Sequence, residues 1–444
     1  MHSIIDYAQA GHFAMFRLKA LIPKGQFARS VSVLAGATAL GQGIVALSSP
    51  ILTRLYTPED FGVLAVFVAV SSLLLTFNSL RYEFAIALPQ SDADAAHLVL
   101  LVVLLLIGST ALLGVIFGLS GEAIAGLLNV PALAAHYGLL LICLFGAGVY
   151  QALNYWAIRQ QAFTPIARTK VVQGAVQTLV QIGAGALALG VFGLLTGYTL
   201  GQISGSFALL RQMWARDRAA FRQITLRRLR ELAVRYRKFP LFMSWSSLIN
   251  AASLQLPALT LGILYGPSVA GWFLLGQRLV AIPMTLIGTS VAQVYLGAAS
   301  HMMRENPAGL LPLYLSTARR LLILGGLPLL AVGVIGPWLF ELVLGPAWRT
   351  SGEFVQVLVP MFIAQFIVST LSQTIVVLER QNIQAIWDTL RLVSVLIGFG
   401  AAGVFDSEPV VAIGLYSFIM TVMYGVLFTI NWRLLQNVMA EKPR

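Results

Sequence analysis

The chain has 444 residues, of which 58% are hydrophobic and only 10% are charged. A soluble domain carries about a quarter charged residues, so a soluble enzyme and a disordered chain are both excluded. The net charge of +12 does not require a nucleic-acid partner, because basic residues collect on the cytoplasmic side of membrane proteins.

Long apolar blocks predict an all-α polytopic membrane protein, since a helix crosses the hydrocarbon in about 20 apolar residues. In chain order, the first six of twelve predicted spans lie near residues 31–52, 61–80, 96–119, 137–158, 171–189 and 191–210. The other six lie near 241–264, 270–299, 321–343, 354–378, 386–405 and 409–431. The predicted units are an N-terminal segment (1–30), a six-helix bundle (31–210), a basic linker (211–240), a second six-helix bundle (241–431) and a tail (432–444).

The N-terminal segment has a mixed composition that includes Asp6, His12 and four basic residues. No cleavable signal peptide is expected, because the apolar run that follows is too long for a signal sequence. Its scattered apolar side chains predict that it lies along the inner membrane interface.

The distribution of Lys and Arg predicts the topology. If the N-terminus is cytoplasmic, only Arg54 and Arg349 of the 29 basic residues fall outside, and Arg278 falls within a span. Arg391 is counted with the inner residues, because it lies in the first turns of its predicted span. This asymmetry predicts that both termini and the 211–240 linker are cytoplasmic.

The 211–240 linker holds ten basic residues, and its acids are Asp217 and Glu231. Such a composition is typical of an anchor on anionic membrane lipid, and a specific partner site is the alternative. The linker also divides the chain into two halves of six spans each.

The two halves share a motif at corresponding loops. Residues 55–62 read LYTPEDFG and residues 264–271 read LYGPSVAG, so both fit LYxPxxxG. Pro and Gly are common in turns, so coincidence is the alternative explanation. An even number of spans per half predicts a parallel repeat, with the bundles related by a pseudo-two-fold axis along the membrane normal. Two such bundles around a central site are typical of a transporter.

Arg278 is the most informative polar residue. It lies about eight positions below the outer end of its predicted span, roughly 12 Å deep. An arginine at this depth costs roughly 2.5–3.5 kcal/mol on insertion scales. It forms either a structural ion pair or carbonyl clamp, or a cationic contact for an anionic substrate. The second reading is favoured, because no carboxylate lies at clear midplane depth in the sequence.

Arginines at the ends of the first two predicted spans are further candidates. Arg81 and Glu83 close the second span, either as an interfacial anchor or as a cytoplasmic mouth where Arg81 meets phosphate. Arg54 is either an outer anchor or an exit-side contact.

Polar stripes run along three of the predicted spans. They comprise Gln173, Gln177 and Gln181 in the fifth span, Ser246, Asn250 and Ser253 in the seventh, and Gln365, Ser369, Ser372 and Gln373 in the tenth. Such stripes either hold helices together or line a cavity for a hydroxyl-rich ligand.

Residues for catalysis or metal binding are sparse. The five histidines form no metal-ligand pair, and the single cysteine, Cys143, excludes a disulfide framework and a cysteine-based metal site. No Walker motif is present, so ATP use is not expected. The longest outer loop, 120–136, has Glu122 as its only acid. The sequence therefore predicts neither an enzyme nor a cofactor.

The assembled residues resemble the oligosaccharide flippases, the polysaccharide-export branch of the multidrug/oligosaccharidyl-lipid/polysaccharide superfamily. The resemblance is carried by LYTPEDFG (55–62), LRYE (80–83), AIALP (85–89), RKFP (237–240), Asn250, QLP (255–257), Gln277-Arg278, Pro283 and Gln293. It extends over nearly the whole chain and is most specific in 53–89 and 236–300.

This resemblance implies the fold and the activity. Such flippases carry undecaprenyl-pyrophosphate-linked sugar units across the bacterial inner membrane, for O-antigen, capsule or exopolysaccharide. A V-shaped pair of bundles with alternating access and a cationic central cavity is implied. Arg278 and Arg81 are the cavity contacts carried over, and Gln277, Asn250, Gln173, Gln177 and Gln365 complete the candidate substrate-binding residues.

The resemblance also implies partners. These are the lipid-linked oligosaccharide, membrane lipid, and a polysaccharide polymerase with its chain-length regulator, with no nucleic acid among them. Two other classes stay open. A drug or cation exporter of the same superfamily would need intramembrane carboxylates, and a polymerase or ligase would need a large outer loop.

Overall fold

The computed structural model describes residues 26–440, and all of its regular elements within that range are helices. The described range leaves out residues 1–25 of the predicted interfacial segment. It also leaves out residues 441–444 of the predicted tail. The all-α class predicted from the apolar blocks is confirmed.

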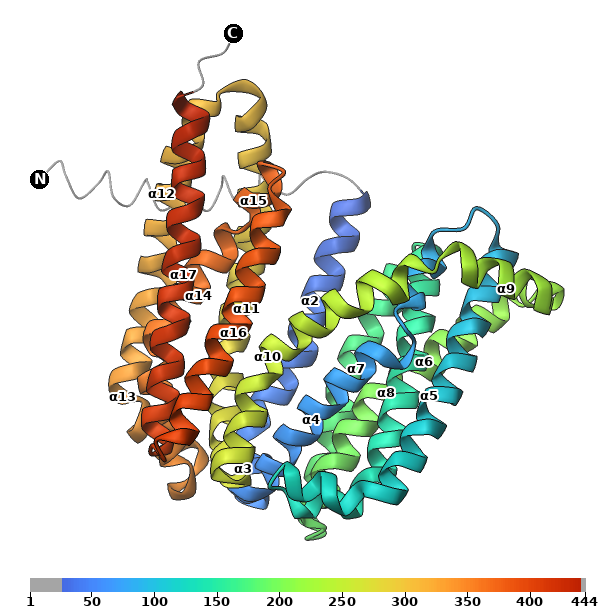
Figure 1. Cartoon of the computed structure of the whole chain (residues 1–444), viewed down its shortest axis with the longest axis horizontal. Helices are drawn as coiled ribbons and strands as arrows, with labels where there is room; N and C mark the ends of the chain where they lie inside the picture. The colour runs from blue at the N-terminus through green and yellow to red at the C-terminus, as the bar shows by residue number, and fades with distance from the viewer. Residues whose placement is uncertain (1–25, 441–444) are drawn as a thin grey trace, which may run out of the picture.

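Six long helical rods form the N-terminal bundle (Figure 1). They are α2 (Gln26–Leu47) continued by α3 (Ser49–Leu55), α4 (Pro58–Asn78), α5 (Asp92–Leu127), α6 (Tyr137–Arg159), α7 (Phe163–Ala186) and α8 (Gly190–Asp217). Short 3₁₀ turns at Tyr82–Ala87, Pro131–His136 and Ala220–Gln223 and the helix α9 (Leu226–Arg235) lie between or after these rods.

The C-terminal bundle repeats this plan. Its first two helices are α10 (Ser244–Tyr265), which follows a π-helical turn (Phe239–Met243), and α11 (Pro267–Glu305). Next, α12 (Leu310–Leu321) continues through a second π-helical turn (Leu322–Gly326) into α13 (Leu327–Leu344). The bundle ends with α14 (Arg349–Leu371) and its extension α15 (Gln373–Val377), α16 (Gln381–Val404) and α17 (Pro409–Ala440). Short 3₁₀ turns at Pro307–Gly309 and Pro346–Trp348 precede α12 and α14. These rods are consistent with the twelve predicted spans. Ten of the described rods are long and apolar enough to cross a membrane, and the more polar α7 and α8 are the exceptions.

The LYxPxxxG motifs start equivalent helices. Pro58 opens α4, where Thr57 and Asp60 cap each other's backbone amides, and Pro267 opens α11 after Gly266, whose φ is 87°. Proline suits the first helical turn, because it lacks the N–H that would be unpaired there and its φ is already helical. The motif is therefore a helix-start signal that occurs once in each half.

The two motifs also touch each other across the bundle interface. A Cβ added to Gly62 would lie 1.7 Å from the Pro267 carbonyl oxygen, and one added to Gly271 would lie 2.0 Å from that of Pro58. The glycine of each motif contacts the proline of the other, and such a reciprocal contact is what a two-fold axis produces. The predicted pseudo-two-fold relation of the bundles is thus confirmed.

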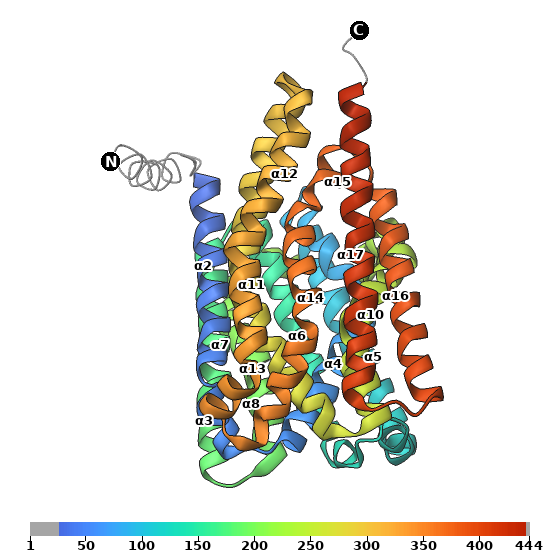
Figure 2. The same ribbon diagram turned by 90° about the vertical axis from the view of Figure 1, so that its left-hand side faces the viewer.

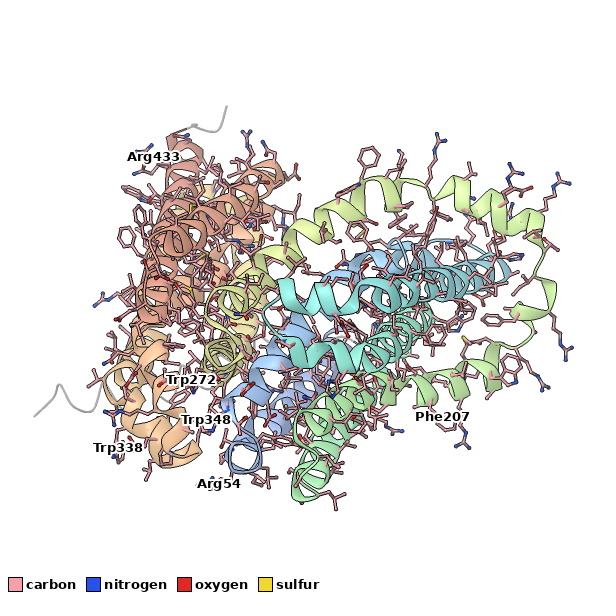
Figure 3. All side chains as sticks on the ribbon, turned by 60° about the horizontal axis from the view of Figure 1, so that its bottom comes forward. Arg54, Phe207, Trp272, Trp338, Trp348 and Arg433 are labelled. Carbon is pink, nitrogen blue, oxygen red and sulfur yellow. The ribbon has the colours of Figure 1, made fainter. Side chains whose placement is uncertain are left out.

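The bundles meet at one end and diverge at the other, where α2 begins, α17 ends and α9 lies (Figure 1). At the joined end, the Trp348 indole N–H donates to the Thr53 carbonyl at 3.2 Å, and its ring packs edge-on against Phe61 with centroids 5.0 Å apart. Arg54 donates to the Val343 carbonyl at 3.3 Å. Arg54 and Trp348 lie at this end, and Arg433 marks the other (Figure 3). Arg54 thus bridges the bundles.

The basic linker contains α9, which docks on the N-terminal bundle. The Thr225 amide donates to His97 Nε2 at 3.0 Å, the Tyr82 hydroxyl donates to the Ala233 carbonyl at 2.8 Å, and Arg228 donates to both carboxylate oxygens of Asp94 at 2.8 Å. The Arg228 guanidinium holds the pKa of Asp94 below its usual range. This ion pair is complete at neutral pH and is lost as the pH falls through the lowered pKa.

A partly buried ion pair lies on α16 of the C-terminal bundle. Arg391 donates to Asp388 at 3.2 Å and stacks on the Trp387 ring at 4.9 Å, with its side chain only 11% exposed. The topology predicted from the sequence groups Arg391 with the basic residues of the inner surface and gives Asp388 no role. The reason is that α16 begins at Gln381, which places both residues two or more turns inside the helix.

Removing one member of this pair is expected to destabilise the bundle. Arg391→Ala leaves the partly buried Asp388 carboxylate with Gln384 as its remaining donor, which costs about 1–3 kcal/mol. Thermal unfolding of the purified protein should show the loss, and the exposed Arg433→Ala variant should unfold like wild type. Equal melting temperatures for both variants would show that the pair does not hold the bundle.

Candidate substrate cavity

A cavity of about 490 Å³ lies between the two bundles, lined by α2, α7 and α8 on one side and by α11 on the other. Its polar and charged lining side chains are those of Thr38, Gln42, Lys170, Gln173, Gln177, Tyr198, Gln202, Arg278 and Thr285. Figure 2 shows α11 beside α2, and the two helices contact each other. Both bundles therefore contribute to one site.

Close packing of three helices builds the N-terminal wall. A Cβ added to Gly174 would lie 2.3 Å from the Gly41 carbonyl oxygen, and one added to Gly201 would lie 2.7 Å from the Gln177 Cβ. Small residues thus let α7 contact α2 and α8 closely. Gln173 and Gln177 follow each other by one helical turn, so they share one face of α7. That face borders the cavity.

The cavity is cationic. Arg278 enters from α11 and Lys170 from α7, and none of the fifteen lining residues is Asp or Glu. Lys170 Nζ lies 4.9 Å from the Tyr150 ring centroid, and the Gln173 amide donates to the Gln202 carbonyl at 3.0 Å. Arg278 lies eleven residues after the start of α11, hence about 16 Å along the helix. Two positive charges without a lining carboxylate suit an anionic ligand.

A polar recess of about 260 Å³ adjoins the cavity between α11 and α14. Gln365, Ser369 and Gln373 from the predicted stripe of the tenth span line it, and Ala281 and Thr285 line both recess and cavity. This recess extends the polar surface into the C-terminal bundle.

Other predicted residues lie elsewhere. Gln277 and Asn250 do not line the cavity or the recess, and Asn250 is exposed on α10. Gln181 is buried, and its amide donates to the Leu194 carbonyl at 3.0 Å.

Arg81 forms a separate buried cluster at the end of α4. Its guanidinium contacts Glu83 at 3.4 Å and Thr76 Oγ1 at 3.4 Å and lies 5.5 Å from the Phe84 ring centroid. Glu83 also accepts from the Ser79 hydroxyl. Leu80 and Arg81 both have positive φ, 49° and 61°, which is strained for residues with a side chain. Arg81 thus contacts a carboxylate, whereas neither Asp nor Glu is among the residues that line the cavity.

Sequence reasoning missed Lys170, Gln42, Gln202 and Tyr198 as cavity residues. Lys170 was grouped with the inner basic residues, because its span was predicted to start at 171. The structure begins α7 at Phe163, so Lys170 lies two turns inside the helix. Lys170 precedes Gln173 by three residues and Gln177 by seven, so all three share one helical face. This spacing could have identified Lys170 as a cavity residue from the sequence.

Two bundles of long apolar helices with a polar cavity between them define a multi-pass membrane protein. A family model described as "Polysaccharide biosynthesis protein" matches residues 51–353, and the chain belongs to this family. Among curated proteins, the succinoglycan biosynthesis transport protein ExoT of Rhizobium meliloti (strain 1021) is 25% identical over 282 residues. That match covers 62% of this chain and 54% of ExoT, so the chain spans about half the length of its relative.

Solved structures show the same fold. The lipid II flippase MurJ in an inward closed conformation gives a TM-score of 0.69 at 12% identity, covering 92% of this chain and 90% of MurJ. An inward-facing multidrug resistance MATE family transporter of the MOP superfamily gives 0.63 at 12% identity, covering 90% and 96%. These likenesses confirm the predicted fold, and the family match confirms that the chain belongs with the polysaccharide biosynthesis proteins.

Proposed function

We propose that this protein is a flippase that moves undecaprenyl-pyrophosphate-linked oligosaccharide units from the cytoplasmic to the periplasmic leaflet by alternating access. The observation that carries the proposal is the cavity shared by both bundles, in which Lys170 and Arg278 face no lining carboxylate. The family description and the transport role in the name of ExoT support it.

The cavity residues suit the two polar parts of such a substrate. A guanidinium offers paired N–H donors to phosphate oxygens, and an ammonium adds a second charge, so Arg278 and Lys170 would hold the pyrophosphate. The amides of Gln42, Gln173 and Gln177 would hydrogen-bond sugar hydroxyls, with Gln365 continuing the polar surface in the recess. Arg81, Gln277 and Asn250 have no place in this cavity and would meet substrate only at another stage.

The proposed orientation puts the diverging end of the bundles at the cytoplasm. The basic linker and α9 lie at that end, and the positive-inside rule assigns them to the inner surface of the bacterial inner membrane. The cavity would then load from the cytoplasmic leaflet and release outside after the joined end opens. A polysaccharide polymerase and its chain-length regulator would take the unit further.

Reporter fusions test this orientation directly. Fusions after Lys238 and after Arg444 should both give cytoplasmic signals, because 26 of the 29 basic residues then lie inside. A fusion in the predicted outer loop 120–136 is the matched control and should give a periplasmic signal. A periplasmic signal after Lys238 would reverse the proposed direction.

The function itself is tested in a strain that lacks the gene. Lipid-linked sugar units should accumulate on the inner leaflet, and surface polysaccharide should be lost until the wild-type gene is restored. A drug or cation exporter would instead leave polysaccharide unchanged and raise drug sensitivity. A polymerase or ligase defect would leave single units on the outer leaflet.

A further inference from the structure

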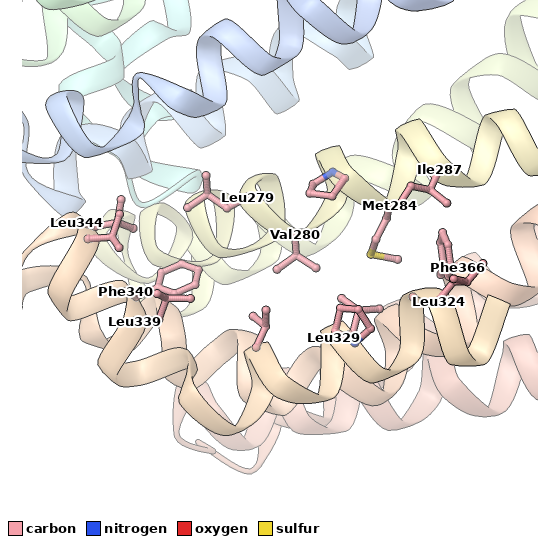
Figure 4. Close-up of a pocket in the computed structure, with 15 residues that line it drawn as sticks. Leu279, Val280, Met284, Ile287, Leu324, Leu329, Leu339, Phe340, Leu344 and Phe366 are labelled. Carbon is pink, nitrogen blue, oxygen red and sulfur yellow. The ribbon is translucent and has the colours of Figure 1, made fainter. Parts of the chain in front are cut away.

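An apolar groove of about 380 Å³ runs between α11 and α13. All fifteen lining residues are aliphatic, aromatic, methionine, proline or glycine. Val280, Leu329 and Phe340 form a buried floor, and Leu324 and Ile287 are exposed at the rim. Figure 4 shows Val280 and Met284 pointing from α11 into the space toward α13.

The groove is long enough to cross the hydrocarbon layer. Its lining extends along the rod of α13 from Leu324 to Leu344, which is about 30 Å at 1.5 Å per residue. The hydrocarbon core of a bilayer is also about 30 Å thick. A hydrocarbon chain could therefore follow the groove from one leaflet to the other without leaving the protein.

The groove adjoins the polar recess, and the recess adjoins the cationic cavity. Arg278 lines the cavity, and its neighbour Leu279 lines the groove. Met284 and Phe366 line both the groove and the polar recess, which itself shares Thr285 with the cavity. One helix, α11, thus has a polar side facing the cavity and an apolar side facing the groove.

A π-helical turn shapes the junction between groove and recess. Gly325 lies in this turn at Leu322–Gly326, and a Cβ added to it would lie 2.1 Å from Phe366 Cε1. Glycine therefore lets Phe366 close the floor where the two compartments meet. Such π turns inside α-helices are frequent at functional sites.

We propose that this groove holds the polyprenyl chain of the transported lipid while the pyrophosphate-sugar head occupies the cavity. The inference rests on the proposed function and adds a second subsite to it. Lipid tails are as apolar as leucine, so the groove binds the chain by shape and by its connection to the head group rather than by removing it from water. The methyl-branched chain would remain in the groove while its head crosses.

Filling the groove should weaken binding of long-chain substrates alone. Val332→Trp places a large ring in the groove, and Val334→Trp is the matched control on the same helix, because Val334 does not line the groove and is 76% exposed. The probes are undecaprenyl diphosphate and the short-chain farnesyl diphosphate, bound to the full-length protein in nanodiscs. Val332→Trp should weaken the binding of undecaprenyl diphosphate by more than about tenfold. The same variant should bind farnesyl diphosphate as wild type does. Val334→Trp should bind both probes as wild type does.

A photoreactive group at the far end of the polyprenyl chain provides a second readout. It should label residues 324–344 in wild type, and excess phosphatidylglycerol should not displace it. The groove proposal would be overturned if both tryptophan variants bound undecaprenyl diphosphate equally, or if the photoreactive group labelled other residues. Displacement by phosphatidylglycerol would also overturn it, because an ordinary lipid would then occupy the site. Failure of the proposed function gives a different result. Farnesyl diphosphate would then not bind, or Arg278→Gln would leave its binding unchanged.

Discussion

Arg278→Gln should lose most transport while reaching the membrane at normal abundance. The substitution keeps a polar side chain of similar reach but removes the charge and the paired donors that suit a pyrophosphate. Hydrogen bonds to charged groups contribute about 1.5–3 kcal/mol each, so the loss should exceed about tenfold. Transport would be measured as surface polysaccharide in a strain without the chromosomal copy.

Arg278→Lys separates charge from geometry. It keeps the charge but not the planar fork, so it should retain part of the transport. Lys170→Gln should also lower transport, because it removes the second cavity charge. The matched control is Arg433→Gln, an exposed arginine at the far end of α17, which should transport normally.

Two outcomes would contradict this role for Arg278. Normal transport by Arg278→Gln would show that the cation is not a substrate contact. Disappearance of the variant from the membrane would show that the residue is structural, which is the carbonyl-clamp or ion-pair alternative that the sequence left open.

Charge and hydropathy were sufficient to predict the fold class. The apolar blocks predicted rods that the structure contains, and a shared motif predicted the two-fold relation. The sequence could not show that the two motifs touch. Equivalent loops of a repeat meet only if they lie close to the symmetry axis, and the tertiary packing of α4 against α11 decides that.

The candidate site was predicted less completely, because a side chain's depth depends on where its helix starts. Arg278 and the stripe residues Gln173 and Gln177 line the cavity. Lys170 escaped notice because α7 begins eight residues before the predicted span, and Asp388 escaped because its helix also begins early. Periodicity identified a polar face on α10 at Asn250, but periodicity alone cannot say which face meets a cavity.

Gly62→Ala should prevent the bundles from closing at their joined end. The added Cβ would lie 1.7 Å from the Pro267 carbonyl oxygen, and this atom belongs to the backbone of a helix start and cannot rotate away. Overpacking typically costs about 1–3 kcal/mol, which changes the ratio of closed to open molecules by roughly five- to more than a hundredfold. Gly271→Ala should act equally by symmetry, because its Cβ would meet Pro58.

The closed state can be measured by crosslinking. Cysteines placed at Arg54 and Val343, which contact each other across the joined end at 3.3 Å, would be linked by a short bifunctional reagent in a Cys143→Ala background. Wild type should crosslink, and Gly62→Ala should not. The matched control is Gly43→Ala, since nothing lies within 4 Å of a Cβ added at Gly43.

Transport should fall together with crosslinking in both glycine variants, because the proposed alternating access requires the joined end to close on each cycle. The double variant Gly62→Ala/Gly271→Ala should be little worse than either single variant, since one separation of α4 from α11 relieves both clashes. Full crosslinking and transport by Gly62→Ala would show that the motif contact is not part of the gate. If the purified variants instead unfold at a lower temperature without losing the crosslink, the two glycines serve packing alone.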